Sequence, residues 1–267
     1  MRASVRSIRF IRPPFSKAAM LFNRSASAVG ALVIAVLLLT GCAPSAPRAS
    51  RTASPGPTVS APAPAPTPPP APSIGSAATA TGPNVPVYDK PDGTVFSTLR
   101  NPQAQGAPLT FLVVTTQGKW IQVQVPQRPN GGTGWVLASS VTLATLSYSL
   151  KVSVAAKTLS LYNNNVLMKT YPVATGTGGT PTPLGNFFLT ELLAPTNSGY
   201  GPYAFGLSAF SEVLSSFGGG PGQIGLHGTD DAASIGRAVS HGCIRMTNDD
   251  ITALAKLLPL GTPISIA

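Results

Sequence analysis

The chain has 267 residues, of which only 10% are charged, and its formal net charge is +10. The length allows one large domain or two small ones. Six basic residues and no acidic residue fall within residues 1–41, so the net charge is +4 from Cys42 onward and +2 from Pro83 onward. The basic surplus belongs to the N-terminal segment, and we therefore expect no nucleic-acid partner.

The N-terminus has the pattern of a secretory signal. Basic residues precede an uncharged apolar run at 28–39, which is too short to span a bilayer comfortably but suits the apolar core of a signal peptide. The Leu-Thr-Gly-Cys segment that follows resembles a lipobox, which implies that residues 1–41 are removed and that Cys42 is lipidated. We expect a membrane-anchored, extracytoplasmic lipoprotein facing the cell wall. Two alternatives stay open: an ordinary secretory signal with a chance cysteine, and a start at Met20.

Residues 42–82 consist almost entirely of Ala, Pro, Ser and Thr. Such a segment cannot bury enough apolar surface to offset the entropy lost on ordering. We expect a disordered tether that reaches on the order of 100 Å from the membrane if it adopts polyproline II at ~3.1 Å per residue.

The next segment, 83–145, alternates short apolar runs with turn signals, which predicts a small barrel. Expected strands cover 85–88, 109–114, 120–125 and 134–136. The Trp120 strand followed by Gly134-Trp135-Val136 resembles bacterial SH3-like domains. That resemblance implies either binding of wall peptide or packing against the following domain, while a structural spacer with both tryptophans in its core is the alternative.

Residues 148–267 predict a second, mainly β domain with one helix. Strands are expected at 148–154, 186–190, 203–207 and 262–266, with a hairpin whose strands at 158–162 and 166–171 flank three asparagines. A helix is expected at 251–258, with Asn248 as its N-cap and two acidic residues in its first turn. The fold class is thus mainly β throughout: a small SH3-like barrel followed by a β-rich domain with one main helix.

Chemistry-bearing residues concentrate in this second domain. The chain has two histidines and two cysteines, and His227, His241 and Cys243 lie within 20 residues of each other. A lipidated Cys42 would leave Cys243 as an unpaired thiol in an oxidising compartment, which suggests reactivity. A thiol needs a base to attack a carbonyl, and a histidine supplies one. The alternatives are an inert buried thiol and a three-ligand zinc site.

The motifs Gly-Leu-His-Gly-Thr at 225–229 and Ser-His-Gly-Cys-Ile-Arg-Met at 240–246 resemble the active-site signature of the YkuD-type L,D-transpeptidases. The hairpin, the Gly-Thr-Pro-Thr-Pro-Leu-Gly loop at 179–185 and the closing helix follow in that family's order. The resemblance implies a YkuD-type catalytic domain over 148–267 that acts on peptidoglycan stem peptides as a monomer, without cofactor or metal. It implies catalytic roles for Cys243, His227, His241, Ser240 and Gly242, and substrate contacts for Arg245, Gly228 and Tyr203.

Several details of such a site follow from the residues. The backbone N–H groups of Gly242 and Cys243 are candidate oxyanion donors. Ser240 or the Gly228 backbone is expected to orient the His227 ring. No carboxylate stands out as a third catalytic member, because the adjacent acids at 230 and 231 are typical of a solvated turn. Arg245 is interpreted either as a carboxylate ligand or as part of a structural salt bridge.

The Gly-, Ser- and aromatic-rich stretch at 198–222 is interpreted as containing a mobile flap, at 200–203 and 217–220, or else as an ordinary long connection.

The expected activity is L,D-transpeptidation, in which Cys243 is acylated by one stem and a second stem accepts the acyl group in a 3→3 crosslink. The same residues would serve an L,D-carboxypeptidase if water were the acceptor. A non-catalytic peptidoglycan-binding lipoprotein is the alternative from another class.

Overall fold

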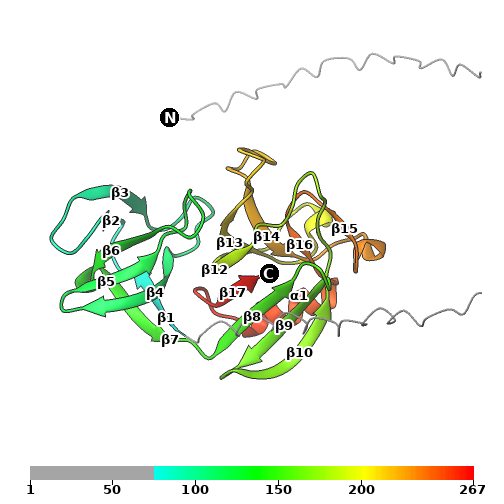
Figure 1. Ribbon diagram of the computed structural model, residues 1–267, viewed down its shortest axis with the longest axis horizontal. Coiled ribbons are helices and arrows are strands. Elements are labelled where there is room, and N and C mark those ends of the chain that lie inside the picture. Colours follow the sequence, from blue (N-terminus) through cyan, green and yellow to red (C-terminus); the bar gives the residue numbers. More distant parts are fainter. Residues whose placement is uncertain (1–74) are drawn as a thin grey trace, which may run out of the picture. The chain divides into compact units, whose positions relative to one another are not determined.

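The computed structural model describes residues 75–267, which form two large β-sheets, a third sheet of two short strands, one α-helix and three short 3-10 turns (Figure 1). The first sheet has seven strands in the order β3-β2-β6-β5-β4-β1-β7. Their bounds are β1 (Ser76–Ala80), β2 (Asn84–Tyr88), β3 (Val95–Arg100), β4 (Thr110–Gln117), β5 (Trp120–Gln124), β6 (Thr133–Leu137) and β7 (Val141–Thr145).

The first strand corrects the expected boundary of the tether. Ser76–Ala80 pairs with both β4 and β7, although residues 42–82 were expected to be disordered. Ala78 is fully buried in a cluster with Phe111 and neighbouring valines. Alanine has little apolar surface of its own, so the Ala-, Pro-, Ser- and Thr-rich composition predicted disorder here. The small side chains of this strand instead pack against larger ones across the sheet.

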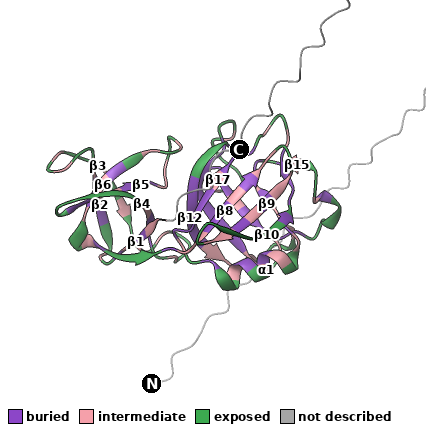
Figure 2. Ribbon diagram, turned by 60° about the horizontal axis from the view of Figure 1, so that its bottom comes forward, coloured by how far each residue is buried: buried purple, intermediate pink, exposed green. Residues whose placement is uncertain are grey.

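The second sheet has eight strands in the order β10-β9-β8-β17-β12-β13-β14-β16. They are β8 (Tyr148–Ser153), β9 (Thr158–Asn163), β10 (Val166–Pro172), β12 (Gly185–Leu193), β13 (Ala204–Phe210), β14 (Gln223–His227), β16 (Ile244–Arg245) and β17 (Pro263–Ile266). A separate parallel pair joins β11 (Thr175–Gly176) to β15 (Ala238–Ser240). Figure 2 shows buried residues running through the central strands and exposed residues on the loops, and the edge strands β3 and β10 are also mostly exposed.

The predicted hairpin at 158–171 is confirmed. β9 and β10 are antiparallel and are joined by Asn164 and Asn165, both with positive φ, of 48° and 64°. This is the backbone that a tight two-residue hairpin requires, and asparagine tolerates it better than most residues. The predicted strands at 148–154, 186–190, 203–207 and 262–266 also match elements of this sheet.

The single helix, α1 (Asn248–Leu257), was predicted with the wrong cap. Thr247 is the N-cap: its hydroxyl accepts a hydrogen bond from Asp250 N. The side chain of Asn248 instead accepts from Thr229 N, which ties the helix start to the segment after β14. Ile251 and Leu254 are buried, because residues three or four apart share one face of a helix.

The fold class is therefore as predicted, mainly β with one α-helix among the described residues. Within residues 75–267 no helix is long and apolar enough to cross a membrane. The expected signal peptide, the lipidation site at Cys42 and most of the expected tether lie outside the described residues. The SH3-like assignment of the first sheet stays a prediction.

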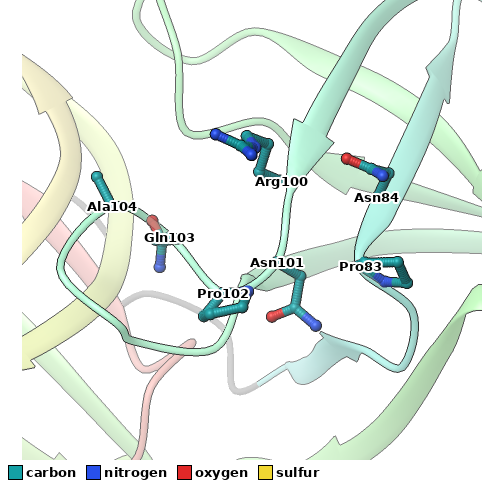
Figure 3. A pocket seen from close by; sticks show the side chains of 7 residues that line it. All are labelled: Pro83, Asn84, Arg100, Asn101, Pro102, Gln103 and Ala104. Atoms are coloured by element: carbon teal, nitrogen blue, oxygen red, sulfur yellow. The ribbon is translucent and has the colours of Figure 1, made fainter.

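The loop after β3 borders a cavity of about 420 Å³ in the first domain (Figure 3). Gln103, on this loop, donates a hydrogen bond to Thr190 O in β12 at 2.9 Å. Arg128, in the loop after β5, also bonds to the second domain, at the segment between β13 and β14. The first domain therefore contacts the strands that carry the candidate site.

Candidate active site

Cys243 sits in a sharp turn between β15 and β16 that depends on a glycine. Gly242 has φ of +115°, and a Cβ built on it would lie 2.9 Å from Ile224 Cδ1. Ser240 clamps the turn, since its Oγ accepts from Gly242 N at 3.1 Å and donates to Cys243 O at 2.5 Å. Ser240 therefore holds the nucleophile turn. Of the two groups expected to orient the His227 ring, the Gly228 backbone does so and Ser240 does not.

A second hydroxyl supports the same turn from the loop after β11. Thr182 Oγ1 donates to Gly242 O and accepts from Gly176 N, both at 2.9 Å. Thr182 is nearly fully buried. Its role was not predicted, because the only signal in the sequence was its place in the Gly-Thr-Pro-Thr-Pro loop.

His227 ends β14 and is only 3% exposed. Its Nδ1 lies 2.5 Å from Gly228 O. A carbonyl only accepts, so Nδ1 carries the proton and Nε2 is left free to accept one. Burial, helped by the positive charge of Arg245, lowers the pKa of His227 to about 4 against the opposing effect of the Gly228 hydrogen bond. His227 is therefore a neutral base at pH 7, oriented by a backbone carbonyl instead of a carboxylate.

The thiol is also uncharged at rest. Burial raises the pKa of Cys243, although the Gly225 N–H group, which donates to Sγ at 3.3 Å, and the charge of Arg245 act in the opposite direction. A Cβ built on Gly225 would lie 3.5 Å from His227 Cδ2 and 3.8 Å from Cys243 Sγ. Thiol and imidazole thus border the same small space above Gly225.

Arg245 supplies the positive charge behind this pair. Its Nε is buried without a hydrogen-bond partner, and neither of the two ion pairs among residues 75–267 involves it. The expected alternative of a structural salt bridge is therefore wrong. The free guanidinium favours the thiolate of Cys243 and the neutral form of His227.

The expected pair of oxyanion donors is reduced to one. The Gly242 N–H group is already bonded to Ser240 Oγ. The Cys243 N–H group forms no hydrogen bond within the described part of the chain. Cys243 N–H is thus the available donor of the two, because an occupied N–H would have to break its bond to Ser240 first.

The structure changes the roles assigned to Tyr203 and His241 from the sequence. Tyr203 does not line the groove beside Cys243; it packs against the hydrophobic core, and its carbonyl accepts from Gly228 N at 3.2 Å. Tyr200 lines the groove instead, with its ring 4.7 Å from the His227 ring. His241 is exposed and is not itself part of the groove lining, but its ring stacks at 5.2 Å on Phe217, which does line the groove. Tyr200 and Tyr203 are only three residues apart, so the sequence alone could not show which of them lines the groove.

The groove itself has a volume of about 670 Å³. Cys243 and His227 line it together with residues of β12, β13 and the loop that joins β13 to β14. No group of three or more His, Cys, Asp or Glu side chains in the described range is placed to hold a metal ion. Asp230 is bonded by Ser198 Oγ at 2.9 Å and is not the partner of His227.

The loop at 211–222, between β13 and β14, is held by the first domain. The Arg128 guanidinium donates to Ser211 O at 2.7 Å, Leu214 O at 2.9 Å and Pro221 O at 3.0 Å. Within the loop, Phe217 and Gly220 exchange two backbone hydrogen bonds of 3.0 Å and both line the groove. The predicted flap at 217–220 is therefore a small hairpin beside the thiol, and Arg128 is its principal brace.

Arg128→Ala should loosen this loop. Three carbonyls lose a charged donor, and we expect a loss of about 2–3 kcal/mol in the free energy of unfolding, with faster amide hydrogen exchange at 211–222. Urea unfolding and exchange mass spectrometry measure both. Arg100→Ala is the matched control, because Arg100 is exposed and its side chain forms no hydrogen bond in the described structure. Equal rates of amide hydrogen exchange at 211–222 in the two variants would contradict the proposal that Arg128 holds this loop.

The low pKa of His227 predicts a loss of stability in acid. Below its ordinary pKa of 6.5 the unfolded chain binds a proton at His227, whereas the folded protein does so only near pH 4. The free energy of unfolding should therefore fall by about 3 kcal/mol as pH drops through this window, and be fully retained above it. Urea unfolding of wild type and His227→Gln at several pH values isolates the effect, because the variant should lack this fall. If the free energy of unfolding falls equally with pH in wild type and in His227→Gln, the low pKa of His227 is contradicted.

Residues 147–266 match the family model described as the L,D-transpeptidase catalytic domain. Over 122 residues the chain is 42% identical to YkuD of Bacillus subtilis, which is named as an L,D-transpeptidase; the match covers 46% of this chain and 67% of the relative. Among solved structures, Bdellovibrio bacteriovorus Bd1075 matches with 31% identity and a TM-score of 0.37, over 45% of this chain and about half (48%) of that one. L,D-transpeptidase 3 of Mycobacterium tuberculosis, with a faropenem-derived adduct, matches with 16% identity and a TM-score of 0.38, over 50% and 72%.

Proposed function

Because the chain belongs to the YkuD family of L,D-transpeptidases, we propose that it crosslinks peptidoglycan stem peptides through an acyl-enzyme on Cys243. The observation that carries this proposal is the pairing at Gly225: a thiol held by the Gly225 N–H group and a neutral imidazole with Nε2 free border the same space in a 670 Å³ groove. A nucleophile, an oriented base and room for a carbonyl between them are what acyl transfer needs.

In the first half-reaction, Cys243 Sγ attacks the carbonyl carbon at the L-centre of the donor's diamino acid while the thiol proton passes to His227 Nε2. The C–N bond to the terminal D-alanine then breaks, and the proton moves from His227 to the leaving amine. Both groups are uncharged at rest, so proton transfer accompanies the attack and does not precede it. Cys243 N–H donates to the developing oxyanion, a bond worth ~3 kcal/mol in the transition state.

In the second half-reaction, the side-chain amine of another stem attacks the thioester. His227 takes a proton from that amine and returns it to sulfur as the C–S bond breaks. The new C–N bond is a 3→3 crosslink, and the free thiol is restored. Arg245 supports both steps, because its unpaired positive charge stabilises the negative charge that develops on Cys243 Sγ as its proton leaves in the first step and as the C–S bond breaks in the second.

The experiment that tests the nucleophile is intact mass spectrometry of the protein after exposure to faropenem. Its strained β-lactam carbonyl acylates an activated nucleophile without needing an acceptor. Wild type should gain one adduct, located on the peptide that contains Cys243, and Cys243→Ala should gain none. Adducts of equal yield on both proteins would exclude Cys243 as the acylated residue, and no adduct on wild type would exclude an activated thiol.

The site of action is proposed from the N-terminal sequence. The apolar run at 28–39 and the Leu-Thr-Gly-Cys segment support lipidation of Cys42 and an extracytoplasmic location at the membrane. Cys42→Ala should move the protein from the membrane pellet to the soluble fraction of the cell. An unchanged distribution would reject the lipid anchor.

A further inference from the structure

The groove contains a buried carboxylate for which the proposed reaction has no use. Glu191, on β12, is only 9% exposed and lines the groove that also holds Cys243 and His227. No described residue forms an ion pair or a hydrogen bond with its side chain. Burial raises the pKa of Glu191, with no neighbouring charge to offset it. A buried, unpaired acid is costly to keep, so its presence in a groove suggests a ligand as its partner.

Glu191 and the thiol lie on one row of the sheet. Glu191 pairs with Gly206 in β13, and Gly206 pairs with Gly225 in β14. Gly225 N–H then donates to Cys243 Sγ. Adjacent strands are ~4.8 Å apart, so about 10 Å separates the backbone of Glu191 from that of Gly225.

The two glycines leave the floor between acid and thiol open. A Cβ on Gly206 would lie 2.6 Å from Glu191 Oε1, and one on Gly225 would lie 3.8 Å from Cys243 Sγ. Both side chains therefore stand on the same face of the sheet, with the carboxylate reaching over Gly206 towards the thiol. No side chain of this row intervenes.

The nearest amide does not satisfy the carboxylate. Gln223 Nε2 also lies over Gly206, 2.8 Å from the same Cβ position. Its two N–H groups are used, in bonds to Thr190 Oγ1 at 3.0 Å and to Leu207 O at 2.9 Å. Gln223 thus lies beside Glu191 without forming a hydrogen bond to it, so the carboxylate remains available to a donor in the groove.

We propose that Glu191 binds the ammonium group at the end of the donor's diamino-acid side chain, an assignment that rests on the proposed function. With the L-centre carbonyl at Cys243, the side chain runs across the two glycines and ends at the carboxylate, about one lysine-type side chain away. An ammonium group supplies the charge and the donors that Glu191 lacks. Glu191 is then a specificity residue that selects stems with a free amine at this position.

The test compares two synthetic tetrapeptide stems, one with a free side-chain amine on its diamino acid and one with that amine acetylated. With protein in excess, release of D-alanine measures acylation alone. Wild type should prefer the free amine by about 10- to 100-fold, the value of a charge-assisted bond in a buried site. Glu191→Gln keeps the shape and loses the charge, so its ratio should fall to near one.

Glu212→Gln is the matched control, because Glu212 is exposed, does not line the groove and carries the same charge. It should retain the wild-type ratio. Gly206→Ala gives an independent check, since its methyl group would displace the Glu191 carboxylate and should also lower the ratio. A faropenem adduct on Glu191→Gln shows that its thiol remains reactive.

The outcomes separate the two proposals. A wild-type ratio near one, or a ratio in Glu191→Gln equal to that of wild type, overturns the ammonium site and leaves the proposed function standing. Failure of wild type to release D-alanine from either stem overturns the proposed function, and the ammonium site with it.

Discussion

His227→Gln should slow acylation of Cys243 by about 100- to 10,000-fold at pH 7, the contribution of a positioned general base. Glutamine is of similar size and keeps polar atoms in the buried position, but it cannot take the thiol proton. His227 is the candidate base because its Nδ1 is tied to Gly228 O and its Nε2 is free. The rate of D-alanine release in a single turnover measures the loss.

His241→Gln is the matched control, since His241 is the only other histidine in the chain, is exposed, and is not itself part of the groove lining, although its ring stacks on Phe217. We expect it to change the rate only a few-fold, as surface substitutions away from reacting groups do. A slow His241→Gln variant beside a fast His227→Gln variant would reverse the assignment of the base.

Gly242→Ala should lower acylation by about 100-fold, because a displacement of the nucleophile by about 1 Å is enough for such a loss. An alanine at φ of +115° is strained, and its Cβ would lie 2.9 Å from Ile224 Cδ1. Ile224 can relieve the contact by moving its side chain, but the backbone strain is relieved only by a shift of the turn that carries Cys243. The strain should also cost about 1–3 kcal/mol of folding free energy. Faropenem adduct rates and urea unfolding measure the two effects.

Gly236→Ala separates the effect of backbone strain on stability from the effect of displacing the nucleophile on acylation. Gly236 has a positive φ of +84°, but nothing lies within 4 Å of a Cβ built there. This variant should therefore lose stability and retain the acylation rate. If it loses as much activity as Gly242→Ala, the effect of the latter comes from general destabilisation and not from the position of the thiol.

The parts of the fold that the sequence predicted well are set by local rules. The hairpin at 158–171 combines alternating apolar residues with a turn whose positive φ suits asparagine, and both signals lie within a few residues of each other. The helix was found for the same reason. Its cap was misplaced by one residue because Thr247 and Asn248 are both good caps, and only the bond between Asn248 and Thr229 decides between them.

Parts of the site were beyond sequence reasoning because they depend on contacts between distant segments. The brace from Arg128 to Ser211 joins residues 83 apart in the chain, and the bond from Thr182 to Gly242 joins residues 60 apart. Glu191 carries no motif; its importance comes from strand register, which places it in line with Gly206 and Gly225. Residue type and spacing alone cannot give that register.

If Cys243 carries the acyl group from one stem peptide to the amine of another, purified tetrapeptide stems incubated with the protein should become crosslinked, and mass spectrometry of the products detects this. Wild type should produce dimers that have lost one D-alanine and are joined by a 3→3 bond, with a thioester on Cys243 detectable early in the reaction, and Cys243→Ala should produce neither. Free tripeptide without dimers would indicate water as the acceptor and contradict transpeptidation. Dimers formed equally by Cys243→Ala would contradict the role of the thiol.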